Sequence, residues 1–271
     1  MNQRIAFIGG GNMASAIIGG LIRQGLAANQ IDVVEPAAET RRKLDVDHGV
    51  VAQEAAGPFL QHAGLVVWAV KPQFFKGATL PVRAHTAQAL HLSVAAGIRS
   101  HSIAKWLGSE RIVRAMPNTP ALIGKGISAL FARAAVSAED RDRVTQVMTT
   151  TGDLLWLDQE DGLDAVTALS GSGPAYVFYF MEAMTTAGVE MGLTREQAHR
   201  LSLATFIGAG ELARSTGESP KSLRQKVTSP GGTTQAAIAS MEDDDLQAQV
   251  INAVYAARQR AKELGDAFGA D

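Results

Sequence analysis

The clearest indication of the fold is a stretch near the start of the chain, Ile5-Ala6-Phe7-Ile8-Gly9-Gly10-Gly11-Asn12-Met13-Ala14. Residues 5–8 are all apolar and predict a short buried strand, and the glycines at 9–11 predict a tight turn. The small and apolar residues from 14 to 22 predict a helix that packs closely on that strand. Gly9, Gly11 and Ala14 fit the pattern G-x-G-x-x-G/A between a strand and a helix, which indicates a dinucleotide-binding turn. The alternative is a strand–helix turn that is merely tight.

Each of these small residues has a physical reason in such a turn. Gly9 permits the sharp bend, Gly11 lets the backbone approach a pyrophosphate, and Ala14 lets the helix pack on the strand. The helix N-terminus then offers amide donors and a partial positive charge to the phosphates.

Glu35 ends the second apolar run, 26 positions after Gly9. An acidic residue at this place usually accepts hydrogen bonds from the adenosine ribose of NAD, and a carboxylate repels the 2′-phosphate of NADP. Arg41 and Arg42 follow closely, however, and either side chain could turn toward such a phosphate. The sequence therefore leaves the choice between NADH and NADPH open.

Further apolar runs alternate with helix-length segments in the first 160 residues. Such runs are typical of parallel strands that are covered on both faces. After residue 158 the strand rhythm stops and helical spacing dominates. The expected fold is α/β, with an N-terminal Rossmann-type, doubly wound, mostly parallel sheet in residues 1–160 and an all-α domain in residues 161–271. The strands are expected at 5–8, 31–35, 65–70, 90–96, 112–116, 127–131 and 154–157, and the C-terminal helices at 163–186, 194–216 and 243–264.

The last of these helices carries an apolar face from Leu246 to Leu264, for which core packing is favoured over a dimer seam. The acidic run from Glu242 to Asp245 is expected at the positive end of that helix.

Composition excludes several functions. The 271 residues contain 25 Lys and Arg against 27 Asp and Glu, so we expect neither nucleic acid nor a membrane as a partner. The absence of cysteine excludes disulfides, thiol catalysis and Cys-ligated zinc, and fits a cytoplasmic protein. No metal site is expected, because the six histidines form no ligand pair. The uncharged run 5–22 resembles an export signal, but its central glycines interrupt the apolar core that a signal needs.

Several polar or small segments are expected at one edge of the sheet or in the helical half. Lys71 and the small residues Ala95, Ala96 and Gly97 follow strands, where open α/β sheets bind ligands. A polar loop follows at 114–120, and Ser/Gly segments at 170–174 and 228–234 are expected to open helices and offer an anion nest. For each segment alone, packing or loop formation is about as plausible as ligand contact.

The missing motifs restrict the chemistry. No tyrosine has a lysine four residues later, and no lysine occurs between Lys125 and Lys221. An obvious proton donor for a carbonyl reduction is therefore absent. A protonated C=N bond is already an electrophile, and its reduction needs mainly the positioning of hydride donor and acceptor.

Six segments together resemble pyrroline-5-carboxylate reductase, and the likeness covers essentially the whole chain in order. The two most specific are 164–176, Asp-Ala-Val-Thr-Ala-Leu-Ser-Gly-Ser-Gly-Pro-Ala-Tyr, and 227–234, Val-Thr-Ser-Pro-Gly-Gly-Thr-Thr. The others are 9–14, the two strand-end segments 69–72 and 95–98, and the loop 116–120.

This resemblance implies reduction of 1-pyrroline-5-carboxylate to L-proline by NADPH or NADH, in a homodimer that in that family often assembles into a decamer. It also implies that the helical half binds substrate and dimerises. The implied cofactor contacts are Gly9, Gly11, Asn12, Met13, Ala14, Glu35, Ala69, Val70, Lys71, Pro72, Ala95, Ala96 and Gly97. The implied catalytic residues are Thr167 and Lys71, and the implied substrate contacts are Asn118, Thr167, Ser229, Gly231, Gly232, Thr233 and Thr234.

Two departures from the family pattern concern the cofactor. Segment 53–56 offers no Asn for the adenosine ribose, and Glu35 stands where small polar or basic residues often favour NADPH. Two other functions stay open: reduction of a different cyclic imino acid, and a non-catalytic NAD(P)-sensing module.

Overall fold

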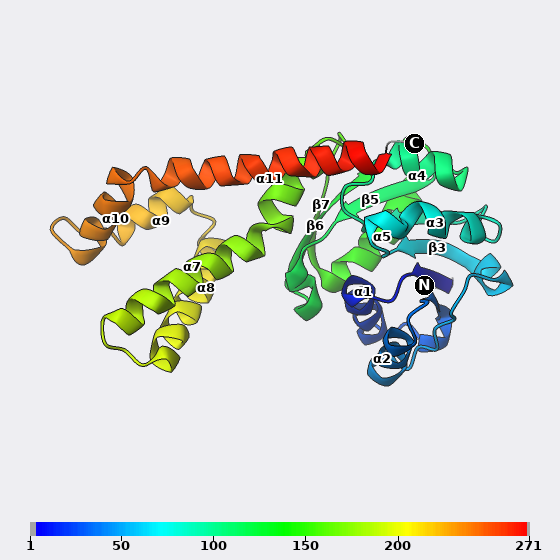
Figure 1. The fold of residues 1–271 in the computed structure, drawn as a ribbon, viewed down its shortest axis with the longest axis horizontal. Helices are drawn as coiled ribbons and strands as arrows, with labels where there is room; N and C mark the ends of the chain where they lie inside the picture. Colours follow the sequence, from blue (N-terminus) through cyan, green and yellow to red (C-terminus); the bar gives the residue numbers. More distant parts are fainter. Residues whose placement is uncertain (1–3, 270–271) are drawn as a thin grey trace. The chain divides into compact units, whose positions relative to one another are not determined.

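A seven-stranded sheet forms the centre of the first part of the chain (Figure 1). The structure, a computed structural model, describes residues 4–269. The strands lie in the order β2-β1-β3-β4-β5-β6-β7, and all neighbours are parallel except β5 and β6. The chain changes direction across the sheet between β1 and β3, the kind of switch point at which such sheets bind ligands. The strands are β1 Arg4–Ile8, β2 Ile31–Val34, β3 Ala63–Trp68, β4 Leu90–Ser93, β5 Ile112–Met116, β6 Gly126–Ala132 and β7 Gly152–Trp156.

Helices cover both faces of this sheet. Ile5 and Phe7 of β1 belong to one apolar core, together with residues of α1, α2 and α5. The alternate residues Ala6 and Ile8 belong to a second core, with residues of α3 and α4. Because successive side chains of a strand point to opposite faces, the apolar run at 5–8 has to be buried on both sides. The helices are α1 Asn12–Arg23, α2 Ala38–His48, α3 Pro72–Arg83, α4 Ser100–Leu107 and α5 Ala138–Met148, with 3₁₀ turns η1 Ala28–Gln30, η2 Pro58–His62, η3 Thr119–Ile123 and η4 Thr149–Thr151.

The remainder of the chain is helical. Its elements are α6 Gly162–Val166, the π-helix η5 Thr167–Gly171, α7 Gly173–Glu190, α8 Arg195–Thr216, α9 Pro220–Lys226, α10 Thr233–Asp243 and α11 Leu246–Gly269. Contacts divide the chain into two compact units, one made of residues 1–172 with 257–271 and the other of residues 173–256. In the second unit α7 and α8 pack against each other.

The predicted fold class is confirmed, and each predicted strand is present within a few residues of its expected ends. The predicted start of α8 is also confirmed, because Thr194 Oγ1 accepts a hydrogen bond from the Gln197 amide at 3.2 Å. The Gln197 side chain accepts one from the Thr194 amide at 2.9 Å, which completes a capping box.

Two local predictions are met only in part. Segment 170–174 does open a helix, since α7 begins at Gly173, but the residues before it form a π-helix and not a loop. The acidic run reaches the positive end of the last helix only with its final residues, and the Asp245 carbonyl accepts a hydrogen bond from the Gln249 amide at 3.1 Å. Glu242 and Asp243 end α10, and Asp245, with φ +51°, lies in the turn before α11 begins at Leu246. The apolar face of α11 is at least half-buried from Leu246 to Leu264, as packing requires.

Candidate active site

The glycine turn after β1 has the geometry that a bound dinucleotide needs. Gly9 has φ +93°, its amide donates to the Val34 carbonyl at 2.8 Å, and a Cβ atom there would lie 2.7 Å from the Ala69 carbonyl oxygen. Only glycine fits that position. A Cβ atom on Gly11 would instead meet nothing within 4 Å.

The helix that follows this turn is open at its N-terminus. Gly11 caps α1 without a side-chain hydrogen bond, and within the described chain no acidic residue occupies the first turn. Asn12 and Gly11 are exposed, whereas Ala14 is fully buried against the sheet. The first amides of α1 therefore face open space, and a pyrophosphate fits there.

Strand ends bring the next predicted residues to the same edge. The register pairs Ile8 with Trp68 and Trp68 with Ser93, so β1, β3 and β4 end side by side. Hydrogen bonds continue past the strands, from the Ala69 amide to the Ile8 carbonyl at 2.8 Å and from the Val94 amide to the Trp68 carbonyl at 3.0 Å. The structure thus brings Gly9, Ala69, Val70, Ala95 and Ala96 together around the switch point.

Lys71 and Gly97 lie at the ends of this edge. Lys71 is exposed and forms the N-cap of α3, with Pro72 in the first turn. Gly97 has φ +76°, and a Cβ atom there would touch Leu264 and Phe268 of α11 at 3.4 Å. The backbone at Gly97 is therefore in contact with the end of the last helix.

Glu35 lies across the turn from α1. Its carboxylate accepts hydrogen bonds from the amides of Gly10 and Ala37, each at 2.8 Å. Arg41 donates to the main-chain carbonyls of Glu35 and Pro36 at 2.9 and 2.6 Å. Glu35 and Arg41, whose charges bear on the choice between NADH and NADPH, are thus both held by hydrogen bonds to backbone groups.

Thr167 opens the π-helix, an arrangement that is frequent at functional sites. Its hydroxyl donates to the Leu163 carbonyl at 2.8 Å. One turn on, a Cβ atom on Gly171 would lie 2.6 Å from Met116 Cε, so the last residue of β5 packs on the π-helix. A loop follows β5. In that loop, Asn118 Oδ1 accepts a hydrogen bond from the Ile127 amide at 3.0 Å.

Beneath this packing lies a buried ionic cluster that sequence reasoning missed. Arg114 of β5 lies 2.6 Å from Glu160, which also accepts hydrogen bonds from the amide and hydroxyl of Ser100, both at 2.6 Å. Arg99 pairs with Asp164 of α6 at 2.7 Å. The one sequence feature that could have indicated this cluster is Arg114, a charged residue inside the apolar run 112–116.

The ionisation of Glu160 follows from these contacts. Burial favours the neutral carboxyl, but the charge of Arg114 and the hydrogen bonds from Ser100 outweigh burial. The pKa of Glu160 consequently lies below its ordinary value. The cluster fixes the segment that leads into Thr167.

The predicted anion nest lies in the second unit, where one turn holds all of its residues. Gly231 has φ +74°, and its amide donates to the Gln235 side chain at 2.6 Å. The Gly232 amide donates to the Ser229 carbonyl at 3.0 Å. Thr233 and Thr234 then form the first positions of α10. Hydroxyls and first-turn amides therefore converge at one helix N-terminus, as an anion site requires.

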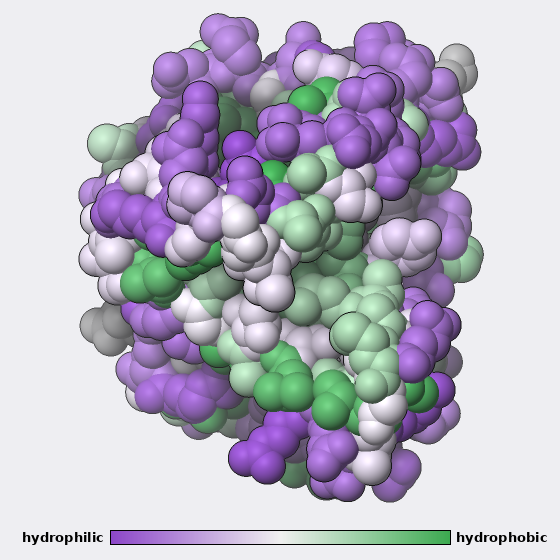
Figure 2. All heavy atoms as spheres, turned by 90° about the vertical axis from the view of Figure 1, so that its left-hand side faces the viewer, coloured by the Kyte–Doolittle hydropathy of each residue, from purple (hydrophilic) through white to green (hydrophobic). Residues whose placement is uncertain are grey.

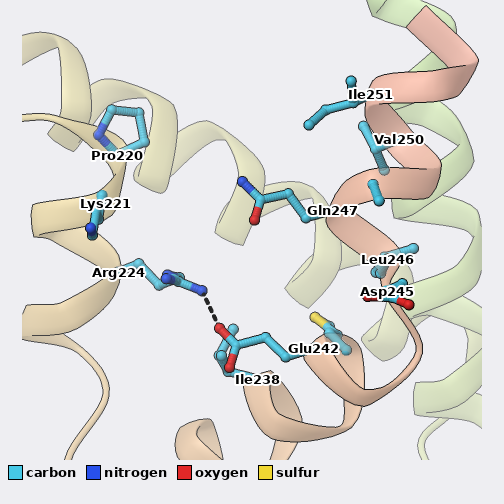
Figure 3. A pocket seen from close by; sticks show the side chains of 12 residues that line it. Pro220, Lys221, Arg224, Ile238, Glu242, Asp245, Leu246, Gln247, Val250 and Ile251 are labelled. Atoms are coloured by element: carbon cyan, nitrogen blue, oxygen red, sulfur yellow. Dashed lines mark hydrogen bonds and ion pairs between the residues drawn. The ribbon is translucent and has the colours of Figure 1, made fainter.

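The second unit also exposes apolar surface. A cavity of about 860 Å³ lies among α9, α10 and α11, with Ile238, Val250 and Ile251 in its lining (Figure 3). Arg224 and Glu242, which also line it, form an ion pair with 3.0 Å between Nη1 and Oε1. Large apolar side chains elsewhere on this unit are exposed, and Figure 2 shows apolar residues gathered on the surface toward the viewer, bordered by hydrophilic ones. The exposed large apolar side chains of this unit include Phe178, Tyr179, Leu201, Ile207 and Tyr255.

The Rossmann-type sheet, the glycine turn at its switch point and the open α1 N-terminus define the class of NAD(P)-dependent oxidoreductases. The pattern described as pyrroline-5-carboxylate reductase dimerisation matches residues 160–264, and that described as NADP oxidoreductase coenzyme F420-dependent matches residues 4–97. The chain is 47% identical to the pyrroline-5-carboxylate reductase of Pseudomonas aeruginosa, over 98% of both chains.

Two solved structures are similar over nearly the whole chain. The pyrroline-5-carboxylate reductase of Coxiella burnetii has a TM-score of 0.91 and 39% identity, covering 97% of this chain and 99% of that one. The Plasmodium falciparum pyrroline carboxylate reductase, crystallised with NADP bound, has a TM-score of 0.87 and 28% identity, covering 97% and 98%. The chain belongs to the pyrroline-5-carboxylate reductase family, which confirms the resemblance found in its motifs.

The chain is therefore an NAD(P)-dependent oxidoreductase with a helical dimerisation domain. Within residues 4–269, no helix combines the length and the apolar character needed to cross a membrane.

Proposed function

We propose that this enzyme reduces 1-pyrroline-5-carboxylate to L-proline with NADH or NADPH, the last step of proline biosynthesis. The observation that carries the proposal is the likeness to the Pseudomonas aeruginosa enzyme, because it spans 98% of the chain and thus both the glycine turn and the anion nest. Residues 1–160 would bind the cofactor, and residues 161–271 would bind substrate and dimerise.

The cofactor would lie along the switch-point edge and supply a hydride. Gly9, Gly11 and the first amides of α1, from Asn12 to Ala14, would hold its pyrophosphate, and Glu35 would receive the adenosine ribose. The nicotinamide end would lie near Ala69, Val70, Lys71, Pro72, Ala95, Ala96 and Gly97.

Thr167 would orient the substrate ring nitrogen. Its hydroxyl hydrogen is already donated to the Leu163 carbonyl, so its oxygen remains a hydrogen-bond acceptor. An acceptor matches the N–H of a protonated imine, which is the form that accepts hydride readily. Asn118, two residues after the end of β5, would contact the substrate as well, since its Oδ1 is engaged but its amide nitrogen is a donor.

The substrate carboxylate would bind the turn that opens α10. Ser229, Thr233 and Thr234 offer hydroxyl donors at a helix N-terminus, with no competing carboxylate in the first turn of the described helix. The Gly231 and Gly232 amides would exchange their bonds to Gln235 and Ser229 for the substrate carboxylate. Such a nest holds an anion without an arginine.

A homodimer, assembling into a decamer and working in the cytoplasm, is the proposed state. The exposed apolar residues and the cavity of the second unit support an interface there, because monomers rarely expose large apolar patches. A second copy would cover them.

The proposal is tested by supplying purified protein with pyrroline-5-carboxylate and either dinucleotide, and following nicotinamide absorbance. Consumption of NADH or NADPH with formation of proline is expected. Turnover of only a six-membered cyclic imine would instead favour the related imino-acid reductase. Binding of a dinucleotide without turnover of either imine would favour the sensing module.

A further inference from the structure

We propose that Glu35 and Glu54 form an acidic rim that makes this enzyme select NADH over NADPH, an inference that rests on the function proposed above. Both residues lie where the second strand ends. Gln53 pairs with Val34 of β2, and the Glu35 amide donates to the Gln53 carbonyl at 2.8 Å. The two acidic residues are thereby brought to the same side of the glycine turn.

The Glu35 carboxylate is fixed in place. Its two oxygens each accept one backbone hydrogen bond at 2.8 Å, from Gly10 and from Ala37. A Cβ atom on Gly10 would lie 3.3 Å from Glu35 Cγ, so the side chain packs tightly against the turn. Each oxygen retains a lone pair, and an ionised carboxylate can only accept. Glu35 is thus arranged to receive ribose hydroxyls and to repel a phosphate at the same position.

Arg41, the first cation after Glu35, is engaged elsewhere. Its guanidinium donates to two main-chain carbonyls, of Glu35 and Pro36, and lies 3.4 Å from the Glu54 carboxylate. Its side chain is 22% exposed, against 76% for Glu54. To bind a 2′-phosphate, Arg41 would have to give up its two main-chain hydrogen bonds and its pairing with the Glu54 carboxylate.

The segment that follows Glu35 provides no other side chain to bind a 2′-phosphate. Residues 36–38 are Pro-Ala-Ala and provide no side-chain donor for a phosphate. Arg42 is exposed on α2 and is the other cation nearby in the sequence. The local side-chain charge from Glu35, Glu54 and Arg41 is negative, so a 2′-phosphate dianion would be brought into a repulsive site.

The test measures binding without turnover. Calorimetric titration of the purified enzyme is expected to give NADH a dissociation constant at least about tenfold lower than that of NADPH. The adenosine fragments ADP and 2′,5′-ADP should differ in the same direction, because they lack the nicotinamide. Equal or tighter binding of NADPH overturns the inference alone. Failure of both dinucleotides to bind overturns the proposed function together with it.

Variants identify the residues responsible. Glu35→Ser should weaken NADH binding and strengthen NADPH binding, so that the ratio of their dissociation constants shifts by about tenfold or more. Glu54→Gln should shift that ratio in the same direction by a smaller factor. Glu39→Gln removes an exposed negative charge from the first turn of α2 and should leave the ratio unchanged. A Glu35→Ser enzyme that keeps the ratio of the unmodified protein overturns the inference.

Arg41→Ala and Arg42→Ala test the competing role of the cations. If Arg41 stays with the backbone and Glu54, neither substitution should weaken NADPH binding by more than about twofold. A tenfold loss of NADPH binding in either variant would show that a cation holds the 2′-phosphate, and it would overturn the inference.

Discussion

Arg114 Nη1 lies 2.6 Å from Glu160 Oε1, and this ion pair joins strand β5 to the segment that enters α6. The Arg114 side chain is 5% exposed and that of Glu160 18%. Two charges removed from water in this way stabilise a fold only as a pair, because either one alone would remain buried without its counterion.

Glu160→Gln should therefore lower the free energy of unfolding by about 3–5 kcal/mol. Urea unfolding followed by tryptophan fluorescence measures the change. Glu211→Gln removes the carboxylate of an exposed pair with Arg214 on α8 and should cost less than about 1 kcal/mol. Equal losses in the two variants would contradict a special role for the buried pair.

His91 predicts a loss of stability in mild acid. Burial, aided by the charge of Arg111, lowers the pKa of His91 from 6.5 to about 4, and its Nδ1 accepts a hydrogen bond from Trp68 at 3.1 Å. Between these two pKa values the unfolded chain binds a proton that the folded chain excludes. Stability should therefore fall as the pH falls from about 6.5 toward 4.

The expected contribution of His91 is about 2 kcal/mol between pH 7 and pH 5. Urea unfolding at the two pH values measures it. Since carboxylates such as Glu160 also titrate in acid, the comparison is with His91→Gln, whose stability should depend less on pH. If His91→Gln has the same pH dependence as the unmodified enzyme, His91 is not responsible.

Gly11→Val should separate cofactor binding from folding. A Cβ atom at Gly11 would meet nothing within 4 Å, so we expect a valine there to be accommodated by the fold, yet to project where the pyrophosphate approaches. The melting temperature should stay within about 2 °C, while NADH binding falls by more than about tenfold. Calorimetry and thermal unfolding measure the two effects.

Gly9→Ala is the matched comparison, because its Cβ atom would lie 2.7 Å from the Ala69 carbonyl oxygen and φ is +93°. This variant should lose stability as well as binding. If the Gly11→Val enzyme binds NADH normally, the glycine turn is not part of the cofactor site.

The parts of the fold that could be predicted are those with a local pattern. Apolar runs such as 65–70 identify strands because burial on both faces requires every residue to be apolar. The glycine turn is equally local. The acidic run at 242–245 could be placed only in part. Helix-dipole reasoning puts acidic residues at the start of the last helix, but it does not show that a turn at Asp245 separates two helices.

The buried cluster and the π-helix could not be predicted. Arg114 and Glu160 are 46 residues apart, and Ser100 and Glu160 are 60 apart, so no spacing rule relates them. The segment 167–171, Thr-Ala-Leu-Ser-Gly, carries no pattern that distinguishes a π-helix from other helical turns, and Met116, which packs beside Gly171, is 55 residues before it. Tertiary contacts determine both features.

Thr234→Ala should raise the KM for pyrroline-5-carboxylate by about tenfold, with a smaller change in kcat. The substitution removes one hydroxyl donor from the turn that opens α10 and leaves the backbone amides in place. Ser240→Ala removes an exposed hydroxyl farther along the same helix and should leave KM unchanged. An unchanged KM in Thr234→Ala would refute the carboxylate nest.

Thr167→Val should lower kcat by about tenfold or more while KM changes little, because an acceptor for the iminium N–H is lost where orientation matters. Valine keeps the shape of threonine, and Thr167→Ser should restore most of the activity. Thr205→Val removes a hydroxyl with the same bond to the carbonyl four residues back, at 2.8 Å on α8, and should leave kcat unchanged. Steady-state kinetics with saturating NADH measure all three. If serine fails to restore kcat, the hydroxyl is not the group that acts, and the methyl packing of Thr167 within the π-helix accounts for the loss.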